Sequence, residues 1–248
     1  MSRQQIVAGN WKLNGSKALI NAFNEHFTHT DIPNVSIMLF VPALYAEAVD
    51  KSAFCVGVQN ISEHSSGAHT GELSVAMLND LGIKYTLVGH SERRQMYGDS
   101  NAVVAKKVSV ALDADITPIL CVGESLETCD AGQLNEFIQA QLDSVIELVG
   151  IAGLSRCVVA YEPIWAIGTG HTATPEQAQA VHAFIRQYIA SKDAMSAQQI
   201  SILYGGSVNA QTASDLFAQP DIDGGLVGGA SLQQADFLTI CQAANQRG

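Results

Sequence analysis

Short apolar runs alternate with longer segments of helical periodicity along the whole chain. Each run spans five to seven residues and is rich in β-branched side chains. Runs of this length and composition are typical of strands buried on both faces of a parallel sheet, although short buried helices can look alike. The predicted strands lie within residues 6–10, 35–41, 53–59, 85–89, 117–123, 157–162, 200–205 and 224–229.

Residues that cap helix N-termini begin the clearest helical segments between these runs. They are Ser16, Asn101 and Thr174, the last of which is followed by Pro175. A capping side chain accepts a hydrogen bond from a free backbone N–H, and proline suits the first helical position. We therefore expect helices over residues 16–28, 101–114 and about 174–191.

The alternation of strand and helix predicts an α/β fold with a parallel sheet. Eight units in 248 residues give about 31 residues each, with no linker or break in composition. This regularity favours one closed (β/α)₈ barrel domain over residues 1–248. An open, doubly wound sheet is the competing architecture.

Composition narrows the class of protein further. Apolar residues make up 47% of the chain and charged residues 15%, which argues against disorder. The apolar runs are too short to span a bilayer, and the N-terminus has no targeting pattern. The five cysteines form no paired motif, so we expect reduced thiols and a cytoplasmic location.

The net charge of −11 disfavours binding to nucleic acid through a basic surface. No run of Lys or Arg is longer than two residues. A site for a phosphorylated substrate would therefore have to create its own local positive potential. Backbone amides at helix starts and one or two placed cations can do this.

Polar and glycine residues cluster where the predicted strands end. Asn10 and Lys12 follow the first strand and His90 follows the fourth, while Glu162 ends the sixth. Glycine pairs follow the seventh and eighth strands, at residues 205–206 and 228–229. In a barrel these ends converge on one rim, where such folds carry their active sites, and paired glycines let backbone amides approach an anion.

Glu162 is the candidate base. It ends an apolar strand and precedes Pro163, which holds its backbone extended, and partial removal from water makes a carboxylate a better base. A structural ion pair with an arginine is the alternative. Residues 163–170 favour catalysis, because an apolar loop begun by proline and ended by glycine is typical of a lid that excludes water.

Two further side chains fit the same chemistry. His90 precedes an expected helix start, which disfavours the imidazolium and suits a neutral hydrogen-bond donor, although a structural histidine is also possible. Lys12 stands between apolar neighbours close to Asn10, so it either points to solvent or adds positive charge to the site. Its place on the rim favours the site.

Five strings of residues then carry a resemblance to a known family. From residue 6 to about 240 the chain resembles the triosephosphate isomerase family, and the matching strings occur in the same order. The ten residues around Glu162 are the most specific match. The strings are NWKLNG (10–15), GHSERR (89–94), YEPIWAIGTG (161–170), YGGSV (204–208) and GGLVGGASL (224–232).

The resemblance implies a TIM barrel that interconverts dihydroxyacetone phosphate and D-glyceraldehyde 3-phosphate, in glycolysis and gluconeogenesis. It implies that Glu162 moves the proton, that His90 and Lys12 stabilise an enediolate, and that Asn10 orients the substrate. Glu92 would support Lys12 and His90. No metal or organic cofactor is implied.

The resemblance also assigns the phosphate contacts and a partner. Gly168 on the lid and the residues Ser207, Gly228 and Gly229 would bind the phosphate through backbone amides. The loop 59–74 would join two subunits in a homodimer, with Thr70 reaching the partner's site.

The loop departs from the family pattern at one position. His69 stands where an aromatic residue is more common, so we expect the dimer to weaken below about pH 6, where imidazoles gain charge.

Two other functions compete with the isomerase. A sugar-phosphate epimerase or aldolase would use a similar barrel, but an aldolase needs a Schiff-base lysine, for which Lys12 is poorly suited. A catalytically inactive barrel kept for binding would retain the glycines and could lose the base. The joint presence of Lys12, His90 and Glu162 favours an enzyme.

Overall fold

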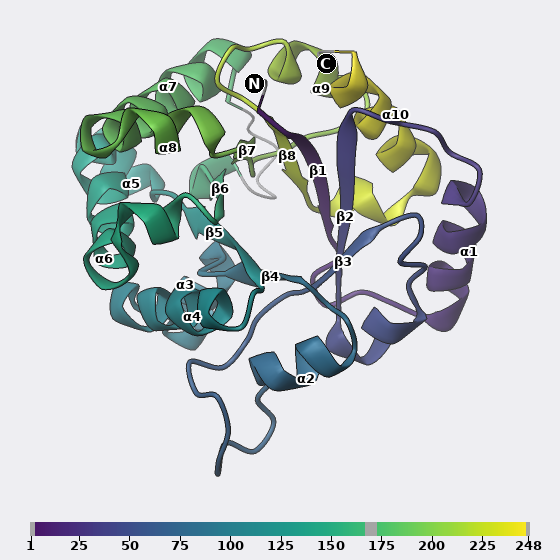
Figure 1. The fold of residues 1–248 in the computed structure, drawn as a ribbon. Coiled ribbons are helices and arrows are strands. Elements are labelled where there is room, and N and C mark those ends of the chain that lie inside the picture. Colours follow the sequence, from purple (N-terminus) through teal and green to yellow (C-terminus); the bar gives the residue numbers. More distant parts are fainter. Residues whose placement is uncertain (1–2, 167–172, 247–248) are drawn as a thin grey trace.

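The computed structural model describes residues 3–166 and 173–246, and its eight strands form one closed parallel barrel in chain order (Figure 1). The expected (β/α)₈ architecture is confirmed. Each predicted apolar run coincides with one strand, although β1 begins one residue before its run and several other strands are shorter than theirs. The strands are β1 (Gln5–Asn10), β2 (Val35–Val41), β3 (Cys55–Val58), β4 (Tyr85–Val88), β5 (Thr117–Val122), β6 (Val158–Tyr161), β7 (Ile202–Tyr204) and β8 (Gly224–Val227).

Helices surround the barrel on its outer side (Figure 1). Three short 3₁₀ turns, η1 (Ala43–Ala48), η2 (Ile164–Ala166) and η3 (Gly229–Leu232), lie between the strands and helices. The α-helices are α1 (Lys17–Phe27), α2 (Val75–Asp80), α3 (Ser91–Tyr97), α4 (Asn101–Asp113), α5 (Leu126–Asp130), α6 (Leu134–Leu154), α7 (Pro175–Lys192), α8 (Ala194–Gln199), α9 (Ala213–Phe217) and α10 (Gln234–Asn245).

Local capping explains where the predicted helices begin. The side chain of Ser16 caps α1, and Thr174 forms a capping box with Gln177 at the start of α7, as the sequence predicts. The prediction for α4 is off by one residue. Ser100, not Asn101, is the N-cap, because its hydroxyl accepts from the N–H of Val103.

Side chains of alternate strand positions fill two separate apolar layers. Along β1, Ile6 and Ala8 belong to the cluster inside the barrel, whereas Val7 belongs to the cluster between strands and helices. Among the residues that the structure describes, both layers consist of buried side chains, as in the packed interior of a barrel of eight strands. A substrate site must therefore lie at the rim.

Helix α6 is the one element, within the described residues, that is long and apolar enough to cross a membrane by length and composition. It lies in the outer ring of helices and packs against α4 and α7. Core helices of barrels meet the same criterion.

The loop 59–74, between β3 and α2, extends away from the barrel (Figure 1). Its two ends are joined where the N–H of Ser62 donates to the carbonyl of Leu73 at 2.8 Å. His64 and His69 stack with ring centroids 3.9 Å apart and planes 4° from parallel. The loop is thus an ordered projection that exposes Thr70 near its tip.

Candidate active site

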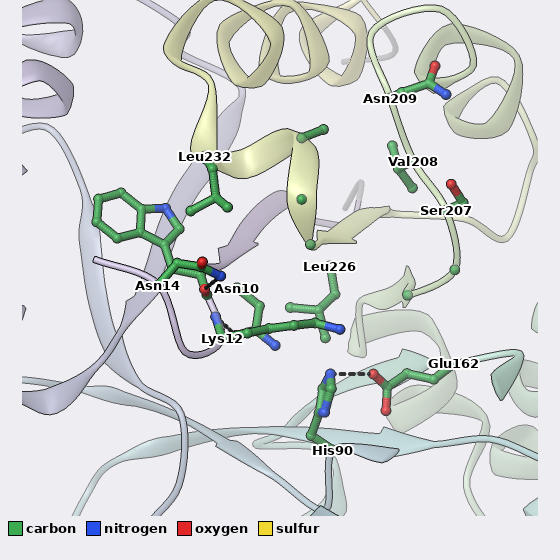
Figure 2. Close-up of a pocket in the computed structure, with 16 residues that line it drawn as sticks. Asn10, Lys12, Asn14, His90, Glu162, Ser207, Val208, Asn209, Leu226 and Leu232 are labelled. Atoms are coloured by element: carbon green, nitrogen blue, oxygen red, sulfur yellow. Dashed lines mark hydrogen bonds and ion pairs between the residues drawn. The ribbon is translucent and has the colours of Figure 1, made fainter. Parts of the chain in front are cut away.

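The predicted site residues gather around one cavity of about 350 Å³ at the carboxyl ends of the strands. Figure 2 shows Lys12, His90 and Glu162 converging on it from different strand ends, with Ser207 on a separate loop. Asn10, Gly228 and Gly229 also line the cavity. Glu92 lies in an adjoining cavity of about 420 Å³, Thr70 lies away on the loop, and Gly168 falls outside the described residues.

Glu162 is 2% exposed and directly follows β6. Its Oε2 accepts a hydrogen bond from the N–H of Ser91 at 2.9 Å, and its Oε1 lies 2.9 Å from Nε2 of His90. The carboxylate of Glu162 is therefore bound by two groups, a histidine ring and a backbone amide. Within the part of the chain that it describes, the structure does not pair Glu162 directly with an arginine, which is the alternative interpretation of this residue.

The position of Glu162 also affects its neighbours. Burial, with the nearby carboxylate, holds the pKa of the Cys121 thiol well above its usual range. Gly205 stands where a Cβ would come within 2.9 Å of Cγ of Glu162. The glycine after β7 therefore leaves room for the base as well as for a ligand.

His90 immediately precedes α3, and its Nδ1 accepts a hydrogen bond of 3.3 Å from the N–H of Glu92. An imidazole nitrogen that accepts from an amide carries no proton, so the proton of the neutral ring lies on Nε2. Burial lowers the pKa of His90, but the carboxylates of Glu162 and Glu92 raise it, and the net shift is upward. This upward shift of the His90 pKa depends on the Glu162 carboxylate remaining beside the ring.

Lys12 points into the site and is held from three directions. Its N–H donates to Oδ1 of Asn10 at 3.0 Å, and its carbonyl accepts from Nε2 of Gln59 at 2.8 Å. Its Nζ lies 2.7 Å from Oε1 of Glu92. These contacts offset the cost of a backbone φ of 51°, which is unusual for a residue other than glycine.

Glycine turns form the other wall of the cavity. Gly205 and Gly206 precede Ser207 after β7, while Gly228 and Gly229 follow β8 and lead into η3. A Cβ on Gly206 would overlap the hydroxyl of Tyr204, whereas one on Gly229 would meet nothing within 4 Å. The space beside Gly229 is thus open to a ligand, and the backbone can supply amides to an anion.

The described half of the predicted lid packs beside Glu124. The indole N–H of Trp165 and the hydroxyl of Tyr161 both donate to Oε1 of Glu124, at 2.9 and 3.0 Å. Burial raises the pKa of Glu124, although the two donors oppose this shift. Trp165 is therefore half-buried and bound to the carboxylate of Glu124. Residues 167–170 of the predicted lid lie outside the described residues.

Sequence reasoning missed three supports of the site. The amide of Ser91 binds Glu162, Gln59 binds the carbonyl of Lys12, and Arg94 binds the carbonyl of Gly89. Gln59 and Arg94 lie in rim segments that the strand-end pattern marks, which is the signal that could have found them. Among the residues that the structure describes, no group of three or more His, Cys, Asp or Glu side chains is placed to hold a metal.

A buried carboxylate, an imidazole and a lysine facing two glycine turns define a class of protein: a barrel enzyme that moves protons on a small phosphorylated substrate. Residues 5–244 match the family model of triosephosphate isomerase. The chain belongs to the triosephosphate isomerase family. It is accordingly an isomerase, and the interconversion of dihydroxyacetone phosphate and D-glyceraldehyde 3-phosphate in glycolysis follows from the family.

Individual relatives agree over nearly the whole length. The chain is 52% identical over 247 residues to the triosephosphate isomerase of Xanthomonas campestris pv. campestris (strain 8004), with 98% of each chain covered. It is 52% identical over 246 residues to that of Thiobacillus denitrificans, covering 98% of this chain and 99% of the relative. The match to the enzyme of Delftia acidovorans is 52% over 250 residues, with 98% and 99% covered.

Proposed function

We propose that Glu162 is the base that carries the proton between the two carbons of the triose phosphate. The observation that carries the proposal is the convergence of Glu162, His90 and Lys12 on one cavity. Removing a proton beside a carbonyl leaves an enediolate. Its negative charge needs a hydrogen-bond donor and a cation, which are the Nε2–H of His90 and the ammonium of Lys12.

The carboxylate must move before it can act. Both of its oxygens are occupied, by the amide of Ser91 and by Nε2 of His90. When the carboxylate turns toward the substrate it frees that Nε2–H to donate to the substrate's oxygen. The raising effect of Glu162 on the pKa of His90 is then lost, so burial favours the neutral ring.

The glycine wall supplies the phosphate site. The backbone amides of Ser207, Gly228 and Gly229, together with Gly168 of the lid, would bind the phosphate, and Asn10 would orient the substrate. Binding through amides suits a chain with a net charge of −11, because the positive potential stays local.

Glu92 acts through its neighbours. Its carboxylate lies 2.7 Å from Nζ of Lys12, and its N–H donates to Nδ1 of His90. One residue thereby sets the position of the cation and the tautomer of the imidazole. We assign it a positioning role, and the chemistry as a whole needs neither a metal nor an organic cofactor.

The same chain would work as a cytoplasmic homodimer. Leu13 is 98% exposed beside Lys12, and Tyr97 is 68% exposed on the far side of the cavity of about 420 Å³. A second subunit's loop 59–74, with Thr70 at its tip, is the expected occupant of that cavity. The five cysteines are all free, which suits a reducing compartment.

A coupled assay with D-glyceraldehyde 3-phosphate in the presence of EDTA tests the proposal. Wild type should turn over without added cofactor, and Lys12→Met should lose on the order of 10²-fold or more in kcat/KM because the developing charge loses its cation. Lys84→Met is the matched control, since Lys84 is exposed before β4 at the opposite end of the barrel. An inactive wild type, or a Lys12→Met enzyme as active as Lys84→Met, would contradict the proposal.

A further inference from the structure

Arg94, on α3, turns its side chain inward beneath the active site. Its Nε donates to the carbonyl of Gly89 at 2.7 Å, its Nη1 to Oδ1 of Asn101 at 2.8 Å, and its Nη2 to the carbonyl of Cys121 at 3.2 Å. The planar guanidinium thus joins the end of β4, the start of α4 and strand β5. A lysine could make only part of this fork.

The turn that Arg94 holds is the one that presents the catalytic groups. Gly89 has a φ of +73°, and the next two residues are His90 and Ser91, which supply both contacts to Glu162. A Cβ on Gly89 would lie 2.9 Å from Nη2 of Arg94, so the guanidinium packs directly against this turn. The placement of His90 and of the Ser91 amide therefore depends on Arg94.

Arg94 also places a positive charge behind the base. Arg94 and Glu162 both line a narrow gap that has no room for a water molecule. Burial lowers the pKa of Arg94, while Cys121, Glu162 and Asp99 oppose the shift, and a guanidinium stays charged throughout the working pH range. Its attraction for the Glu162 carboxylate is little screened there.

The neighbouring arginine shows that this arrangement is particular to Arg94. Arg93 turns the other way and binds Oδ2 of Asp99 at 3.1 Å, with 28% of its side chain exposed. The two adjacent arginines of α3 thus point in different directions, Arg94 toward the end of β4 and Arg93 toward Asp99. The inward one contacts the site's backbone and faces the base.

We propose that Arg94 is a positioning residue for the isomerisation: it holds the turn that carries His90 and the Ser91 amide, and its positive charge attracts the Glu162 carboxylate in its resting place. The proposal rests on the role of Glu162 as the base. It predicts effects on catalysis that differ from those of a purely structural arginine.

The test compares Arg94→Lys and Arg94→Met with wild type in the D-glyceraldehyde 3-phosphate assay. Arg94→Lys keeps the charge and loses the fork, so kcat should fall about 10-fold while KM stays within about two-fold. Arg94→Met should lose about 10²-fold in kcat.

Two controls make the outcome decisive. Arg156→Met removes a half-exposed arginine that binds Asp115 and the carbonyl of Leu112, and should leave kcat and KM unchanged. Thermal melting checks folding, and Arg94→Lys decides the matter if Arg94→Met does not fold. A folded Arg94→Met with kcat within three-fold of wild type, or an Arg94→Lys of full activity, would overturn the proposal.

Glu162→Asp is assayed in the same series. If Glu162→Asp is fully active, the role of Glu162 itself is wrong. If Glu162→Asp is impaired and the Arg94 variants behave like wild type, only the positioning role of Arg94 is wrong.

Discussion

Nε2 of His90 lies 2.9 Å from Oε1 of Glu162, so the proposed donor for the substrate's oxygen and the proposed base for its proton contact each other. The N–H of Glu92 donates to the other ring nitrogen. This second contact leaves Nε2 as the nitrogen that carries the proton of the neutral ring. The same hydrogen can therefore serve Glu162 at rest and the substrate's oxygen during the reaction.

His90→Gln tests this relationship. Glutamine keeps an N–H donor but cannot pass a proton as an imidazole does, so kcat should fall on the order of 10²-fold or more while KM changes only a few-fold. The measurement is steady-state kinetics in both directions, with circular dichroism to confirm the fold. A loss confined to KM would show that His90 only binds substrate.

Gly229→Ala tests the phosphate wall. A Cβ on Gly229 would meet no other atom of the protein within 4 Å, so the variant should fold with an unchanged melting temperature. The added methyl group occupies space beside the expected phosphate and should raise KM about 10-fold, with a smaller effect on kcat. If KM stays at the wild-type value, the phosphate lies elsewhere in the cavity.

Glu124→Gln tests the buried carboxyl group beneath Trp165. Burial raises the pKa of Glu124 in the folded protein, so the folded state binds the proton more tightly than the unfolded state. Stability contributed by this group is present at low pH and is lost as pH rises from the ordinary glutamate value of roughly 4.3 through the raised pKa. Glutamine cannot ionise and lacks this loss.

The melting temperature of Glu124→Gln minus that of wild type should therefore increase between pH 5 and pH 8. Glu127→Gln, on the exposed side of α5, is the matched control and should show no such trend. A difference that stays constant or shrinks with rising pH would contradict the assignment.

The fold and the principal site residues could be predicted because both follow from local patterns. Each strand is a short apolar run, and a parallel barrel brings the residue after each run to one rim. That rule places Asn10, Lys12, His90 and Glu162 on one rim, and the apolar lid pattern after Glu162 is what favours catalysis at that residue. The one-residue error at α4 arose because Ser100 and Asn101 are both good capping residues.

The strand-end pattern marks the segments that contain Gln59 and Arg94, but the pairings that these supports make could not be predicted, because they depend on distant parts of the chain meeting. Gln59 lies 47 positions from Lys12, and Ser91 lies 71 positions from Glu162. The φ of 51° at Lys12 is also invisible in the sequence, since lysine has no preference for such a backbone. The exact state of the site, with the base bound to His90, needs the three-dimensional structure.

The rate of Glu162→Asp with D-glyceraldehyde 3-phosphate tests the central claim most directly. The substitution keeps the charge and draws the carboxylate back by about 1 Å, so kcat should fall by on the order of 10²-fold or more while KM changes little. A Glu162→Asp enzyme that keeps the full turnover of wild type would show that another group moves the proton.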